Sequence, residues 1–127
     1  MEASELRIGN LIIGWSGNVE IIKSIVESKT WSGGFYALTD INKTGIRELK
    51  PIPLTEEILL KAGFDNLGEY GFGIGEFHME STDNLRGDFL SKYVYRVISR
   101  KIIEIQYLHQ LQNLYFSLTG KELEINL

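Results

Sequence analysis

Glu76, His78 and Glu80 have the residue types and the spacing that could support metal chemistry. They alternate with Phe77 and Met79, so on a β-strand all three side chains would share one face. Two carboxylates and an imidazole can hold a divalent ion that activates water, and one hypothesis is therefore a metal-assisted hydrolase centred on His78. The same alternation is typical of the solvent-facing side of an amphipathic strand, and we favour that interpretation because the sequence offers no distant further ligand.

A cationic segment in the second half of the chain is a candidate nucleic-acid interface. Its basic and aromatic residues are Lys92, Tyr93, Tyr95, Arg96, Arg100 and Lys101. Cations beside rings that can stack on bases are typical of proteins that bind single-stranded nucleic acid. The whole chain, however, carries 13 basic and 17 acidic residues, with the acidic excess located after Ile52. We therefore expect these cations to pair with acidic residues, and nucleic-acid binding by this segment and the N-terminal strands is the alternative hypothesis.

The third candidate lies on a helix predicted over residues 107–118 and ended by Thr119 and Gly120. The apolar stripe of this helix consists of Leu108, Leu111, Leu114, Tyr115 and Leu118. Phe116 falls outside the stripe, beside His109 and Gln112. Either the helix is buried on two sides, or these three residues form a contact for a partner protein. We expect His109 itself to be solvated or to act as a cap on the polar side of the helix.

Other chemistries are excluded by residue types or spacings that the chain lacks. Because it has no cysteine, it has neither a thiolate metal site nor a cysteine nucleophile. The run from Gly71 to Gly75 lacks the G-x-G-x-x-G spacing of a dinucleotide-binding turn. Ser16 and Ser32 lack the G-x-S-x-G context of a serine hydrolase. We therefore predict no catalytic residues and no cofactor.

The N-terminal sequence and the hydropathy pattern argue against export and membrane insertion. The first apolar run, Leu11 to Ile13, is too short for a signal-peptide core. No stretch approaches the roughly 18 apolar residues that a membrane-spanning helix needs. Together with the absence of cysteine, this favours a location in the cytoplasm.

The first 52 residues are predicted to form a β meander or a small open barrel. Short apolar runs at 11–15, 19–26, 35–38 and 46–52 are separated by turn residues, as in a series of hairpins. Residues 16–18, 31–34 and 42–45 supply these turns because their glycine and asparagine residues tolerate positive φ.

The second half is predicted to contain a short helix, antiparallel strands and the C-terminal amphipathic helix, which makes the fold class α+β. Thr55 is a suitable N-cap for the short helix, and Gly63 is suited to end it. One strand is expected over 68–80, with its glycine side against something close, and one long or two shorter strands are expected over 92–106. We expect residues 1–127 to be a single domain, with a subdivision into 1–52 and 53–127 at the prolines and a shared core.

Three blocks of the sequence resemble a recurrent family of small uncharacterised proteins from Bacteroides-type bacteria, their phages and mobile elements. The blocks are LRIGN at 6–10, LKPIPLTEEILLKAGF at 49–64 and LHQLQNLYFSLTG at 108–120. The family has no established activity, so the resemblance implies an origin but no residue roles. Residues 7–25 are also similar in pattern to small barrels of the KOW-like or Tudor-like type.

These observations predict a non-enzymatic accessory protein of phage or mobile-element origin that works through protein contacts. The hypothesis depends on the missing catalytic constellation, the position of Phe116 and the acidic second half. We expect a protein partner and no membrane, and self-association stays open.

Overall fold

A computed structural model describes residues 1–29, 34–67, 71–75, 77–81, 93–97 and 100–127. The chain divides into two compact units, which are described separately. The N-terminal unit comprises Met1–Ile52 and Leu108–Asn113, and the C-terminal unit comprises Pro53–Tyr107 and Leu114–Leu127. The boundary in the middle of the chain falls between Ile52 and Pro53, in the proline-containing segment.

The N-terminal unit contains an open antiparallel sheet in the order β1-β2-β3-β4. Its strands are β1 (Leu11–Ile13), β2 (Val19–Glu27), β3 (Phe35–Thr39) and β4 (Lys43–Gly45). Two short 3-10 helices flank them, η1 (Ala3–Glu5) and η2 (Ile46–Glu48). After η2 the chain returns to β1, where Ile13 and Lys50 exchange two backbone hydrogen bonds of 2.9 Å. The predicted N-terminal meander is therefore present as an open sheet.

Local turn chemistry explains the β1–β2 hairpin and corrects the prediction for the last strand. Gly17 adopts φ +88°, as expected for the first turn. The predicted turn at 42–45 is wrong, because the turn lies at 39–42 and Lys43–Gly45 is a strand. Thr39 makes this earlier turn, since its Oγ1 accepts hydrogen bonds from the N–H groups of Ile41 (3.2 Å) and Asn42 (2.9 Å). The run predicted as a strand at 46–52 is therefore η2 and a single bridge.

The core of the N-terminal unit lies on one face of this sheet. Its buried apolar side chains are Leu6, Ile12, Ile22, Ala37, Ile46 and Leu49. Ile12 and Ile22 come from neighbouring strands, and Ile46 and Leu49 come from η2 and the residues after it. Ala37 of β3 points into this core. Tyr36 and Leu38, which flank Ala37, lie on the outer face because alternate residues of a strand point to opposite faces.

The C-terminal unit begins with helix α1 (Glu56–Lys61), whose ends match the sequence signals. The Ile58 N–H donates to the Thr55 Oγ1 (3.2 Å), which confirms the N-cap. At the other end Gly63 has φ +86°. The Phe64 N–H donates to the carbonyl of Leu59 (3.0 Å), as in a Schellman motif.

A five-stranded antiparallel sheet follows α1 in the order β5-β6-β7-β8-β9. Its strands are β5 (Asp65–Asn66), β6 (Phe72–Ile74), β7 (Phe77–Ser81), β8 (Tyr93–Val97) and β9 (Arg100–Ile105). The segment 68–80, read as one strand from the sequence, contains the β6–β7 hairpin, with Gly75 at φ +58° beside its turn. The segment 92–106 contains the two shorter strands, β8 and β9.

Helix α2 (Leu108–Thr119) follows the sheet and matches the predicted C-terminal helix within one residue at each end. Gly120 follows it with φ +72°. In the C-terminal unit, the ring of Tyr115 on α2 lies edge-on to Phe77 with 5.5 Å between centroids, and Phe77 also contacts Phe64 at 6.0 Å. The last residues form a packed tail, in which Leu123 is buried.

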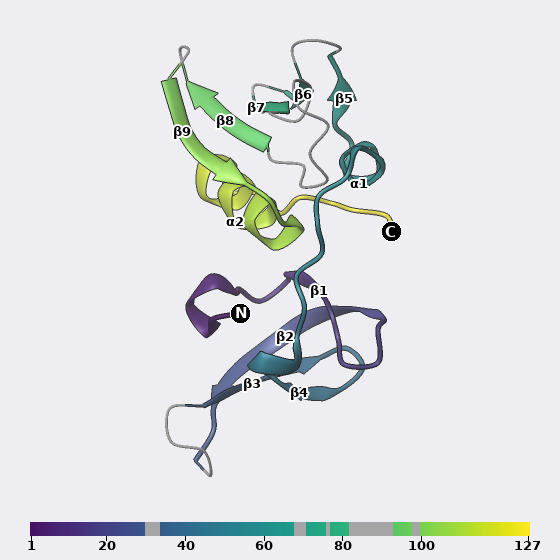
Figure 1. Cartoon of the computed structure of the whole chain (residues 1–127), viewed down its shortest axis with the longest axis vertical. Coiled ribbons are helices and arrows are strands. Elements are labelled where there is room, and N and C mark those ends of the chain that lie inside the picture. Colours follow the sequence, from purple (N-terminus) through teal and green to yellow (C-terminus); the bar gives the residue numbers. More distant parts are fainter. Residues whose placement is uncertain (30–33, 68–70, 76, 82–92, 98–99) are drawn as a thin grey trace. The chain divides into compact units, whose positions relative to one another are not determined.

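The architecture is α+β, as predicted. Each of the two units contains one antiparallel sheet (Figure 1). In the described part of the chain, α1 and α2 are the α-helices, and η1 and η2 are short 3-10 helices. Among the described residues, no helix has the length and apolar character needed to cross a membrane.

Candidate binding surfaces

Two of the three residues predicted to contact a partner are buried inside the N-terminal unit. His109 is 2% exposed and Gln112 is also buried, whereas Phe116 is 39% exposed. The expectation of a solvated His109 is therefore wrong, and the three residues do not form one exposed patch. Leu108 and Leu111 of the leucine stripe are buried as well.

The Gln112 amide closes the free edge of the N-terminal sheet. Its Oε1 accepts a hydrogen bond from the Leu11 N–H (2.9 Å), and its Nε2 donates to the Gly9 carbonyl (3.2 Å). The two groups of the side chain thus pair with the backbone at the start of β1 and just before it, much as a neighbouring strand would. The unpaired N–H and C=O groups of a sheet edge can form hydrogen bonds with a strand of another chain. Gln112 occupies this edge at Leu11 and Gly9.

Side chains around Gln112 extend this polar contact between the N-terminal segment and α2. The Asn113 Oδ1 accepts hydrogen bonds from the Asn10 Nδ2 (2.8 Å) and the Arg7 Nε (3.2 Å). The Asn113 Nδ2 donates to the Glu5 carbonyl (2.9 Å). We call Arg7, Asn10, Gln112 and Asn113 the α2 latch. The latch could not be predicted from the sequence, because it joins residues separated by about a hundred positions.

Burial changes the acid-base behaviour of His109. Loss of hydration lowers the pKa of its imidazole below the ordinary value, which outweighs the opposing effect of the Glu5 carboxylate. The positive N-terminus acts in the same direction as burial. The lowered pKa favours the neutral form of the His109 imidazole.

Of the three predicted metal ligands, only His78 has a side chain in the described part of the chain. No group of three or more His, Asp or Glu residues gathers there. Glu76 lies outside the described residues, and so does the side chain of Glu80. His78 is exposed and pairs with Gly73 across β6 and β7, where a Cβ on Gly73 would overlap its ring. This close approach accounts for the glycine that the sequence pattern placed against a neighbour.

The cationic segment forms the β8–β9 hairpin, in which only the backbone is described. The strands pair Arg96 with Lys101 and Val97 with Arg100. Three cationic positions therefore gather at one end of the hairpin. Lys92 lies outside the described residues, as do the side chains of the other predicted nucleic-acid-binding residues, Tyr93 and Tyr95 included.

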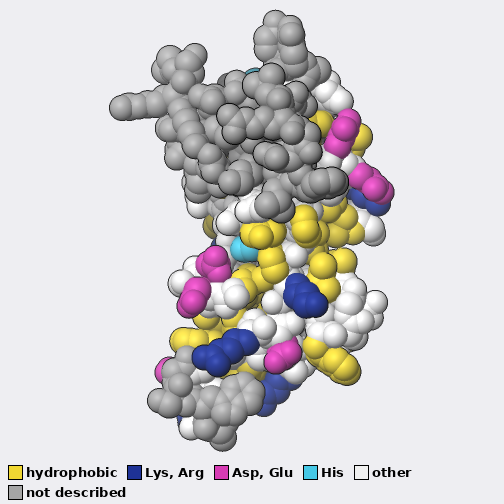
Figure 2. Space-filling view, viewed as in Figure 1, with side chains coloured by type: hydrophobic (Ala, Val, Ile, Leu, Met, Phe, Trp, Pro, Cys, Tyr) yellow, Lys and Arg dark blue, Asp and Glu magenta, His cyan; other side chains and the backbone are white. Residues whose placement is uncertain are grey.

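Three exposed apolar residues at one end of the N-terminal sheet were not predicted. The β1–β2 and β3–β4 turns both lie at this end, because β2 and β3 are antiparallel (Figure 1). It carries Trp15 with 68% of its surface exposed, Ile41 with 53% and Val19 with 43%. We call these three residues the hairpin cluster. Apolar, basic and acidic side chains share the visible surface of this unit (Figure 2).

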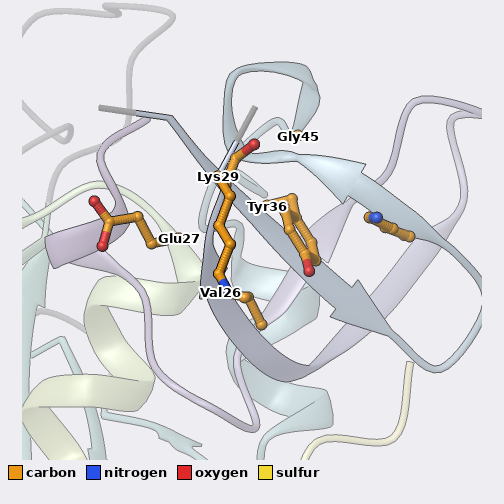
Figure 3. Close-up of a pocket in the computed structure, with 7 residues that line it drawn as sticks. Val26, Glu27, Lys29, Tyr36 and Gly45 are labelled. Atoms are coloured by element: carbon orange, nitrogen blue, oxygen red, sulfur yellow. The ribbon is translucent and has the colours of Figure 1, made fainter. Parts of the chain in front are cut away.

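A hollow of about 410 Å³ lies on the outer face of the same sheet (Figure 3). It is lined by Val26, Glu27, Ser28, Lys29, Tyr36, Lys43 and Gly45. The Lys43 Nζ lies 4.3 Å from the centre of the Tyr36 ring, a cation–π contact that holds both side chains over the sheet.

Comparisons with known proteins found no relative of this chain. No family model, no curated protein and no solved structure matches the chain. The resemblance of the three sequence blocks to small proteins of Bacteroides-type bacteria and their phages therefore remains a prediction.

Proposed function

We propose that the chain is a binding protein without catalytic chemistry, which contacts another protein through the hairpin cluster of its N-terminal sheet. The observation that carries this proposal is the exposure of Trp15, Val19 and Ile41 at one end of the sheet. Single exposed apolar side chains are ordinary, but a cluster that includes tryptophan is typical of the centre of a protein interface.

Folding of the N-terminal unit does not use these side chains. Glu20 and Ile22 occupy the inward positions of β2 and are fully buried, so Val19 has to point outward. Trp15 lies in the turn after β1, and Ile41 lies in the turn before β4. Covering the exposed part of these three side chains would thus stabilise a complex and not the fold of this unit.

The charges at this end of the sheet favour a protein over a nucleic acid. The two turn segments, 14–19 and 39–42, contain no lysine or arginine, and their one charged residue is Asp40. Without cations the hairpin cluster has no groups that neutralise phosphates. An indole with apolar neighbours instead fits an apolar pocket on a partner protein.

Affinity capture with matched variants tests the proposal. Wild-type chain, Trp15→Ser and Phe116→Ser are immobilised and exposed to lysate of the organism that encodes the chain. We expect a specific protein to be retained by the wild type and by Phe116→Ser, and its retention by Trp15→Ser to fall at least tenfold. Equal retention by all three forms, or no retained protein, contradicts the proposal.

The biological setting is part of the proposal. The three sequence blocks support an origin in a phage or mobile element, and the cysteine-free composition supports a place in the cytoplasm.

Nucleic-acid binding is the second candidate, and the backbone register of the β8–β9 hairpin favours it. This register brings Arg96, Arg100 and Lys101 to one end of the hairpin, where a negative counter-charge would be favourable. An anionic strand would supply that charge. Fluorescence anisotropy with labelled single strands should then show binding that weakens steeply with salt and in the Arg96→Ala, Arg100→Ala double variant. A flat titration at low salt removes this candidate.

A further inference from the structure

We propose that the hollow on the outer face of the N-terminal sheet binds a small organic phosphate monoester. This site is separate from the hairpin cluster and does not depend on the contact proposed there. It rests on how the sheet forms the hollow, on the charges of its lining and on its size.

The strand register forms the hollow. Val26, Tyr36 and Gly45 are paired in one row across β2, β3 and β4. Gly45 has no side chain to fill the space beside the Tyr36 ring, so the surface is low at this end of the row. Lys43, two residues before Gly45, lies on the same face and extends its ammonium group over the ring.

The polar groups of the lining are suited to an anion. Lys29 and Lys43 bring two ammonium groups, and the Tyr36 hydroxyl is a further donor. Lys29 and Tyr36 both line the hollow, whereas the Glu27 side chain points away from them in Figure 3. Among the residues that the structure describes, no carboxylate forms an ion pair with either lysine.

Charge and size narrow the class of anion. A phosphate monoester carries a charge of about −1.5 to −2 near neutral pH, which matches the two ammonium groups better than a single carboxylate does. The volume of about 410 Å³ leaves room for an organic group attached to the phosphate. Val26 and the Tyr36 ring supply apolar surface against which that group would pack.

Titrations of the ¹⁵N-labelled full chain followed by NMR test the site. The probes are inorganic phosphate, phenyl phosphate, adenosine monophosphate and a capped phosphoserine tripeptide. We expect saturable shifts at the amides of Val26, Tyr36 and Gly45, with at least one organic monoester binding several times more tightly than inorganic phosphate. The monoester that binds most tightly distinguishes an aryl phosphate, a nucleotide and a phosphorylated peptide as the source of the group.

Three variants and one control make the test specific. Lys43→Ala and Lys29→Ala should each weaken binding, Lys43→Ala by about tenfold, because charge-assisted hydrogen bonds are lost. Gly45→Val should abolish binding by filling the hollow, since Gly45 has φ −60° and ψ 140°, a conformation open to valine. Lys23→Ala removes an exposed charge from β2 outside the hollow and should leave binding unchanged.

Two results would overturn the inference. One is the absence of saturable shifts at these three amides with every probe. The other is equal weakening by Lys23→Ala and Lys43→Ala, which would mean diffuse attraction to the surface. The two lysine variants carry the test even where the valine variant does not fold.

Discussion

Replacing Gln112 with methionine should open the edge of the N-terminal sheet. Methionine has nearly the same shape but cannot hydrogen-bond to the Leu11 N–H or the Gly9 carbonyl. A buried donor that loses its partner costs about 1–3 kcal/mol, and the carbonyl adds a smaller amount. Asn10 keeps its hydrogen bond to Asn113, so the latch is weakened and not removed. We therefore expect a total loss of stability of about 2–4 kcal/mol in the N-terminal unit.

Amide hydrogen exchange measured by NMR gives the sharpest readout of this change. The Leu11 amide should exchange at least tenfold faster in Gln112→Met, since 1.4 kcal/mol corresponds to a factor of about ten. The Ile13 amide donates to the Lys50 carbonyl and should lose less protection. Ser117→Ala, at an exposed position of α2, is the control and should change neither amide. Unchanged exchange at Leu11 in Gln112→Met would refute the role assigned to the latch.

Further predictions concern a buried imidazole, a close packing contact and a helix cap. Because burial lowers the pKa of His109, the unfolded chain binds the proton more readily, so the free energy of unfolding measured by urea titration should fall as the pH drops below about 6.5. This decrease should disappear in His109→Leu and persist in His78→Asn, and a pH-independent wild type would contradict it. Gly14→Ala should lower the free energy of unfolding in urea by about 1–3 kcal/mol, because the new Cβ would overlap the buried Glu20 carboxylate. An unchanged unfolding midpoint would show that the carboxylate can move away. Thr55→Ala should cost about 1 kcal/mol through loss of the cap of α1, and a Ser replacement should recover most of it.

Features set by neighbouring residues could be predicted from the sequence. The cap at Thr55, the helix end at Gly63 and the turn at Gly17 each depend on a few adjacent residues, and all three are present. The turn before β4 was misplaced because Asn42 and Gly45 carry a strong turn signal, whereas the hydroxyl of Thr39 decides the geometry. A hydrogen bond from a side chain to the nearby backbone can move a turn away from the residues with the strongest turn preference. Which of the two decides the position of the turn is hard to predict from the sequence.

Features set by contacts between distant residues could not be predicted. Because Gln112 is polar, its position on the helix suggests an exposed side chain. Its amide instead pairs with the edge of the N-terminal sheet at Leu11, about a hundred residues earlier in the sequence. The hollow depends on the register that places Gly45 beside Tyr36, and the sequence does not specify that register. The sequence placed Trp15 only next to a turn, and the outward direction of Val19 follows from the inward position of Glu20.

Hydrogen–deuterium exchange of the chain with and without its captured partner tests the proposed function most directly. We expect the partner to slow exchange in segments 14–19 and 39–42, which carry the hairpin cluster, and to leave the β8–β9 hairpin unchanged. Slower exchange at the β8–β9 hairpin or at the exposed end of α2, with none at the two turns, would contradict the proposal.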